Sequence, residues 1–161
     1  MKARSRIYGM FAAALAVAVT LAAPAQAHHS FAMYNIRVTR VFTGVVTRVD
    51  PAPNHLAIFF APMNAERKNV ERDAAGEPIV WSVEMGGSAQ MARQGISVNA
   101  FPPGTVFSVG LHPLRNGDTA GTREGGLFRC PDKTPPAPGM HCDSVEGHTA
   151  IGDQPLPKAT E

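Results

Sequence analysis

The sequence predicts a mainly β protein, a small five-stranded barrel with one short helix and an irregular C-terminal tail. The chain has 161 residues, of which 44% are hydrophobic and 17% are charged. This composition suits one domain with a core and is too apolar for a disordered chain. Five short stretches alternate apolar and polar residues as strands do. Five short strands in so small a chain would leave edges and faces exposed unless the sheet closes on itself.

The strand pattern is clearest over residues 79–85. The odd positions of this stretch are all apolar, while Ser82 and Glu84 point to the other face. The other predicted strands are 41–49, 55–60, 105–111 and a weaker segment at 126–129.

The one helix signal lies between the third and fourth predicted strands. Ser88 is expected to cap a helix over 89–94, and Gly95 suits the left-handed residue that ends it. Such a helix has barely two turns, so packing must hold it, and we expect Met91 to contact the sheet. A helix at this place favours an OB-like barrel over a sandwich.

The remaining segments are predicted to be connections. Asn116-Gly117 is typical of a hairpin turn that leads to the fifth strand. The charged segment 62–78 is expected to be a solvated excursion. From residue 131 onward the chain has six prolines and no periodicity, which predicts irregular coil with a frayed end.

Residues 1–27 are predicted to be a cleaved secretory signal, which places the protein in the periplasm. A basic head with three Lys or Arg precedes the uncharged run 7–23, and small residues end the segment at Ala27. An uncleaved membrane anchor is the alternative, although the run is at the lower limit of a bilayer-spanning length. After cleavage we expect no stable membrane insertion.

Cleavage after Ala27 would also change the charge. The remaining chain has 12 Lys and Arg against 13 Asp and Glu, whereas the full chain has a formal charge of +2. A nearly neutral protein has no electrostatic attraction to phosphate backbones, which argues against a nucleic-acid partner. The predicted organisation is a signal at 1–27, a barrel domain at 28–129 and a Pro-rich tail at 130–161.

The two cysteines, Cys130 and Cys142, are predicted to form a disulfide, because export places them in an oxidising compartment. The bridge would close a loop of about 13 residues, contribute roughly 3 kcal/mol and hold the tail against the barrel. Together with Met140, His141 and His148 the cysteines would form a soft-metal cluster only in a reducing compartment.

Histidines suggest a metal site at the start of the mature chain. Cleavage would make His28 the first residue, so that its α-amine and imidazole can chelate one ion, and His29 adds a second ring. Nitrogen donors in a flat arrangement suit Cu(II). His55 and His112, at the ends of predicted strands, are candidates for a further nitrogen. The alternatives are a polar chain start and hydrogen-bonded structural histidines.

No catalytic motif emerges from the sequence. Gly86-Gly87-Ser88 does not match G-x-S-x-G, and no H-E-x-x-H or phosphate-binding glycine loop occurs. Trp81 is expected in the core, with stacking of a sugar or base as the alternative. We therefore expect a non-catalytic periplasmic binding or accessory module for an unknown small ligand or protein partner. The alternative is a copper-binding protein.

Several short motifs occur in order between about residues 28 and 129. They are His28-His29-Ser30-Phe31, Gly44-Val45-Val46-Thr47-Arg48-Val49, Trp81-Ser82-Val83-Glu84, Arg93-Gln94-Gly95, Pro103-Gly104-Thr105 and Gly110-Leu111-His112-Pro113-Leu114-Arg115-Asn116-Gly117. In these motifs the sequence resembles the DUF6152 family of small exported bacterial proteins of uncharacterised function. The resemblance implies an exported small β-barrel domain and supplies no reaction. The segment 62–78 and the Cys-bearing tail look like additions to the family pattern.

Overall fold

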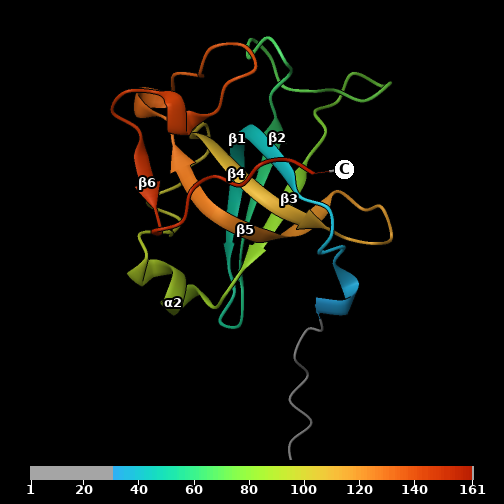
Figure 1. Ribbon diagram of the computed structural model, residues 1–161, viewed down its shortest axis with the longest axis vertical. Helices are drawn as coiled ribbons and strands as arrows, with labels where there is room; N and C mark the ends of the chain where they lie inside the picture. The colour runs from blue at the N-terminus through green and yellow to red at the C-terminus, as the bar shows by residue number, and fades with distance from the viewer. Residues whose placement is uncertain (1–30, 161) are drawn as a thin grey trace, which may run out of the picture. The chain divides into compact units, whose positions relative to one another are not determined.

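The computed structural model describes residues 31–160 (Figure 1). Predictions that concern the signal segment, His28 and His29 lie outside the described residues. Within the described part, no helix combines the length and the apolar character needed to cross a bilayer.

All five predicted strands are present, together with a short sixth strand in the tail (Figure 1). The strands are β1 (Arg40–Pro51), β2 (Leu56–Pro62), β3 (Trp81–Met85), β4 (Val106–Pro113), β5 (Ala120–Arg129) and β6 (Thr149–Ile151). The helices are α2 (Ser88–Arg93) and three 3-10 turns, η1 (Phe31–Met33), η2 (Pro131–Lys133) and η3 (Cys142–Ser144). Strand β5 begins six residues earlier than predicted. The prediction missed its first half because that half is rich in polar residues and glycine.

The five long strands close into a barrel. β1 pairs antiparallel with β2 and β4, β2 pairs with β3, and β4 pairs with β5. A parallel pairing of Ser82–Glu84 in β3 with Ala120–Thr122 in β5 completes the ring. With α2 between β3 and β4, the structure confirms the predicted mainly β, OB-like barrel.

The barrel interior is filled by the apolar positions of the strand pattern. Phe60 and Phe107 pack edge to face with ring centroids 5.3 Å apart, and Phe101 packs on Phe107 in the same way. Trp81 is buried, as expected of a core residue, and its ring centroid lies 4.8 Å from that of Phe42. All of these rings except Phe42 are less than 9% exposed, so they exclude water from the barrel axis.

Helix α2 is held as predicted, but its N-terminus differs from the prediction. Met91 is buried in the core, and Gly95 has the left-handed φ of +84° that ends the helix. The N-cap is Gly87, not Ser88, and no side chain caps the helix. Ser88 Oγ instead donates a hydrogen bond of 2.6 Å to the carbonyl of Ala52. The hydroxyl therefore ties the helix to the β1–β2 turn, which competes with capping.

The C-terminal tail contains more regular structure than predicted. β6 pairs antiparallel with the end of β5, from Leu127 to Arg129. At the far end, Thr39 N–H donates to Thr160 Oγ1 over 2.9 Å. The tail is mostly irregular, as predicted, but both of its ends are bonded to the barrel, so the expected fraying of its end is wrong.

The Cys130–Cys142 disulfide is present, with an S–S distance of 2.07 Å. It belongs to a second apolar cluster on the outer side of the barrel, which also contains Met63, Val106 and Phe128. Met63 comes from the 62–78 excursion, which is otherwise mostly exposed, as predicted. The tail therefore buries apolar surface that a bare barrel would expose.

Glycines let the tail approach the barrel backbone directly. Gly126 N–H donates to the carbonyl of Pro155 over 3.0 Å. A Cβ placed on Gly126 would overlap the carbonyl of Gln154, and one placed on Gly110 would overlap the ring of Pro157. In Figure 1 the last residues of the chain, in red, accordingly run across β4 and β5.

The tail leaves the outer sides of β2 and β3 uncovered. All residues of β4 except His112 are buried, because the tail covers the outer side of this strand. The outward side chains of β2 and β3 remain half-buried. We call this sector the β2–β3 face and define it by Ala57, Phe59, Ser82 and Glu84.

Candidate functional site

An arginine stacked on an aromatic ring lies on the β2–β3 face. Phe59 pairs with Arg48 of β1, and the Arg48 guanidinium carbon is 3.3 Å from the centroid of the Phe59 ring. The side chain of Arg48 stays 57% exposed and approaches Asp50 at 3.9 Å. A flat cationic group supported by an aromatic ring offers a surface on which a planar ligand can stack.

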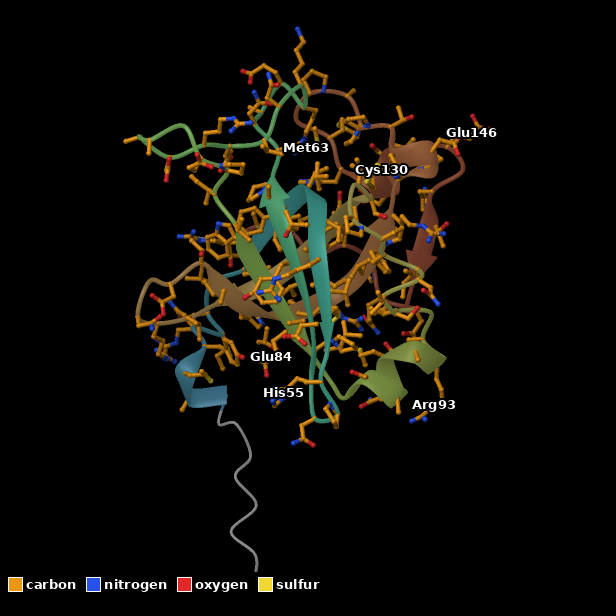
Figure 2. All side chains as sticks on the ribbon, turned by 180° about the vertical axis from the view of Figure 1, so that it is seen from behind. His55, Met63, Glu84, Arg93, Cys130 and Glu146 are labelled. Atoms are coloured by element: carbon orange, nitrogen blue, oxygen red, sulfur yellow. A yellow bond between two sulfur atoms is a disulfide. The ribbon has the colours of Figure 1, made fainter. Side chains whose placement is uncertain are left out.

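Three polar side chains meet at one end of this face. Glu84 receives a hydrogen bond of 3.1 Å from Tyr34 Oη on one carboxylate oxygen. Its other oxygen lies 3.2 Å from His55 Nδ1. Figure 2 shows His55 and Glu84 close together at the end of the barrel from which α2 projects. We call these three residues the Glu84 cluster.

Strand register explains why the cluster forms. Glu84 points outward because β3 alternates, and it pairs with Ala57 of β2. His55 is two residues before Ala57 and therefore lies on the same side of the sheet, diagonal to Glu84. Tyr34 reaches the cluster because the N-terminal segment forms a bridge from Tyr34 to Leu114 beyond the end of β4.

The environment of Tyr34 keeps its phenol protonated. Tyr34 is only 6% exposed. Burial, together with the negative charge of Glu84 and the hydrogen bond to it, raises the pKa of Tyr34 to about 12 from an ordinary value of 10.0. Tyr34 is therefore a hydrogen-bond donor to Glu84 at every physiological pH.

This pKa predicts a loss of stability in alkali. Because folding raises the pKa of Tyr34, its contribution is complete below pH 10 and is lost as the pH rises toward about 12. We expect the stability difference between the native protein and a Tyr34→Phe variant to shrink over this range. Chemical unfolding of both proteins at several pH values measures this difference in stability.

An independent control is the absorbance of tyrosinate. Tyr34 is the only tyrosine in residues 28–161, since the other is Tyr8. Its titration is therefore visible by itself in a protein that starts at residue 28. A titration midpoint at the ordinary value of 10.0 would contradict the burial of this phenol.

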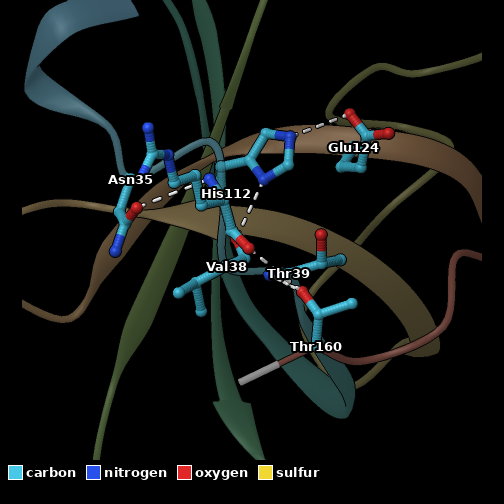
Figure 3. Close-up of polar contacts among 7 residues, drawn as sticks. Asn35, Val38, Thr39, His112, Glu124 and Thr160 are labelled. Carbon is cyan, nitrogen blue, oxygen red and sulfur yellow. Dashed lines mark hydrogen bonds and ion pairs between the residues drawn. The ribbon is translucent and has the colours of Figure 1, made fainter.

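His112 does not join the Glu84 cluster. Its Nδ1 lies 2.9 Å from the carbonyl of Val38, and its Nε2 lies 3.1 Å from Glu124 Oε2 (Figure 3). His112 and Glu84 both pair with Thr122, so two strand spacings of about 4.8 Å each separate their backbones. His112 holds the N-terminal segment on the barrel, and its predicted role as a ligand would require one of these contacts to break.

A buried polar chain joins the tail to the barrel. His141 Nδ1 lies 2.8 Å from Thr43 Oγ1, which lies 2.7 Å from Ser108 Oγ. The N–H of Cys142 donates to the same Ser108 Oγ over 2.8 Å. Burial, and secondly the charge of Arg67, lower the pKa of His141, so its neutral ring can accept the Thr43 proton. Ser108 and Thr43 are 0% and 1% exposed. These hydrogen bonds therefore have a structural role, because they connect the tail to the barrel.

The described residues contain no group of three or more His, Cys, Asp or Glu side chains placed to hold a metal ion. The two cysteine sulfurs form a disulfide, and His148 Nδ1 lies 2.8 Å from the carbonyl of Val145. The Glu84 cluster contributes two donors of suitable type, the imidazole of His55 and the carboxylate of Glu84. A metal at this cluster would need further ligands from elsewhere.

A closed five-stranded barrel with a helix between β3 and β4 defines a small OB-like β-barrel protein. The chain belongs to DUF6152, a family of unknown function, whose model matches residues 16–123. The match includes the whole Glu84 cluster and ends inside β5. No curated protein and no solved structure matches the chain.

Proposed function

We propose that the protein is an exported, periplasmic, non-catalytic binding module that holds a small ligand or partner on the β2–β3 face. The observation that carries the proposal is that the tail covers some strands of the barrel and leaves others accessible. The tail buries the outer side of β4, whereas Phe59, Ser82 and Glu84 stay accessible. OB-like barrels use the face of their second and third strands to bind oligosaccharides and oligonucleotides.

The chemistry of the face favours a neutral, ring-shaped ligand with hydroxyl groups. The Arg48–Phe59 pair can stack against a ring, and the Glu84 carboxylate can accept hydrogen bonds from hydroxyls. Ser82 adds a further hydroxyl on the same face. The near balance of acidic and basic residues after Ala27 argues against a polyanion such as nucleic acid.

The compartment is part of the same proposal. The segment ending at Ala27 has the pattern of a cleaved signal. The Cys130–Cys142 disulfide is consistent with an oxidising compartment, because cytosolic thiols stay reduced.

Titration with neutral sugars tests the ligand class. Residues 28–161, labelled with 15N, are titrated with a series of neutral mono- and disaccharides. We expect amide shifts at Phe59 and Ser82, and we expect Phe59→Ala to weaken binding about fivefold, since losing a stacking surface costs about 1 kcal/mol. Val98→Ala, at an exposed apolar residue away from the face, is the matched control.

Two outcomes would contradict this proposal. Shifts that persist unchanged in Phe59→Ala would place binding elsewhere. A complete absence of shifts with every sugar would exclude the proposed ligand class.

Copper binding is a second candidate, and the Glu84 cluster favours it. Tyr34, which donates to Glu84, follows His28 by six residues. Six residues of chain span at most about 20 Å, so the amine and ring of a leading His28 are within reach of His55. His29, five residues before Tyr34, is subject to the same limit of chain length. His55 would then supply the further nitrogen that a His28 chelate needs for Cu(II).

Cu(II) titration of residues 28–161 tests this second candidate. If the amine is a ligand, acetylating the α-amine of His28 should weaken Cu(II) binding at least about a hundredfold, because the amine can no longer coordinate and the chelate is lost. His55→Gln should weaken it as well, whereas Glu124→Gln, at the partner of His112, should not. Equal affinity with and without the acetyl group would exclude the amine as a ligand.

A further inference from the structure

A cleft that is separate from the β2–β3 face lies where the tail leaves the barrel. Its volume is about 430 Å³, and it opens beside Cys130, which Figure 2 labels. Its polar lining comes from the segment before β4, the end of β5, η2 and β6. The polar side chains are Asn99, Thr105, Arg129, Asp132, Lys133 and Thr149. A cleft of this size accommodates a small metabolite.

The cleft has an excess of positive charge. Arg129 donates one hydrogen bond of 2.8 Å to the carbonyl of Ala100, which orients its guanidinium. Among residues 31–160, neither Arg129 nor Lys133 forms an ion pair. The one carboxylate in the lining is Asp132, so two cations face one anion. A guanidinium without a carboxylate partner is suited to two hydrogen bonds with an oxyanion.

The backbone at the cleft is strained. Asp132 and Lys133 have φ values of +46° and +59°, and neither is glycine. The left-handed conformation costs such residues about 1 kcal/mol each. Among the described residues the Lys133 side chain donates no hydrogen bond, and its Nζ lies beside the turn at Gly104. Strain of this kind is typical of ligand-binding segments.

We propose that this cleft binds a small oxyanion, a carboxylate or phosphate group, between Arg129 and Lys133. The guanidinium of Arg129 would provide the directed contacts and Lys133 a second charge, with hydrogen bonds from Asn99 and Thr149. Most of the lining follows residue 123, where the family match ends, so this site belongs to the tail of this chain. It is independent of the sugar and copper proposals.

Calorimetric titration of residues 28–161 with inorganic phosphate, and separately with succinate, tests the proposal. Lys133→Gly is the decisive variant, because glycine accepts the left-handed φ while the cation is lost. We expect this variant to unfold at an equal or higher temperature and to bind the anion at least about tenfold more weakly. Asp132→Asn should bind it more tightly, since the competing carboxylate is gone.

Lys68→Gln is the matched control, since it removes one exposed cation from the 62–78 excursion. Its affinity should equal that of the native protein. Binding of phosphate alone or of succinate alone would support the site and decide the anion. Amide shifts on binding should appear at 129–134 and not at Phe59, which separates this site from the β2–β3 face.

Three results would overturn the proposal. The first is no binding of either anion by the native protein. The second is an unchanged affinity in Lys133→Gly, which would show that the strained cation plays no part. The third is an equal loss in Lys68→Gln, which would indicate non-specific charge attraction.

Discussion

Replacing Cys130 and Cys142 with alanine should lower the free energy of unfolding by about 3 kcal/mol. The disulfide joins residues 12 positions apart, and without it the unfolded chain gains the entropy of an open loop. The native state also loses packing, because both cysteines lie in the apolar cluster with Met63, Val106 and Phe128. Urea unfolding of the double variant and the native protein measures the difference.

Reduction provides the control for the disulfide prediction. A thiol reductant should shift the unfolding of the native protein toward that of the double variant, and it should leave the variant unchanged. Hydrogen exchange should show the effect first in the tail, at β6 and at the N–H of Cys142. An unfolding free energy unaffected by the substitutions would mean that the tail is held without the bridge.

Substitution of Gly126 by alanine should cost about 2 to 3 kcal/mol. The new Cβ would overlap the carbonyl oxygen of Gln154, which is backbone and has little freedom to move, and would also lie 3.0 Å from the Phe128 ring. To make room, the tail must shift away from β5, which breaks the hydrogen bond from Gly126 N–H to Pro155. Thermal or urea unfolding of the variant measures the cost.

Gly86→Ala is the matched control for Gly126→Ala. A Cβ at Gly86 would lie 2.8 Å from Gln90 Oε1, which is the end of a flexible side chain and can rotate away. We expect a change of less than about 1 kcal/mol there. Equal costs at the two glycines would indicate a general penalty of alanine and would contradict the specific role of the tail contact.

Both predictions concern the tail, and the tail determines which outer surface of the barrel is free. It covers β4 and the end of β5, whereas the β2–β3 face and the cleft beside Cys130 stay accessible. If Gly126→Ala loosens the tail, the cleft between Arg129 and Lys133 should be affected more than the β2–β3 face. Stability and oxyanion binding are therefore linked through the same segment.

Much of the barrel was predictable because strand alternation is a local property. The alternation over residues 79–85 identified β3 and showed that Glu84 faces outward, and the same reasoning placed His55 at the start of β2. Gly95 could be assigned as the residue that ends α2, because its left-handed conformation is a local property that needs no distant contact. Ser88 was assigned wrongly, because the carbonyl of Ala52, 36 residues away, competes for its hydroxyl.

The polar partners of the candidate site were not predictable in the same way. Tyr34 and Glu84 are 50 residues apart, and His141 and Thr43 are 98 residues apart. No periodicity or motif connects residues at such separations. They meet because the N-terminal segment and the tail cross strands whose register is set by the closed sheet.

The amino-acid sequence by itself determined the mainly β class, the existence of the five barrel strands and the short helix, the cystine pairing and the family. Each of these follows from local patterns or from the presence of two cysteines. Only the tertiary structure decided which side chains of the barrel are reachable. Glycines in β4 and β5 appear in the sequence as weak strand formers, yet in the fold they give the tail room to lie on the backbone. The burial of an outward side chain depends on which distant segment packs on the barrel, and a local sequence pattern does not predict that packing.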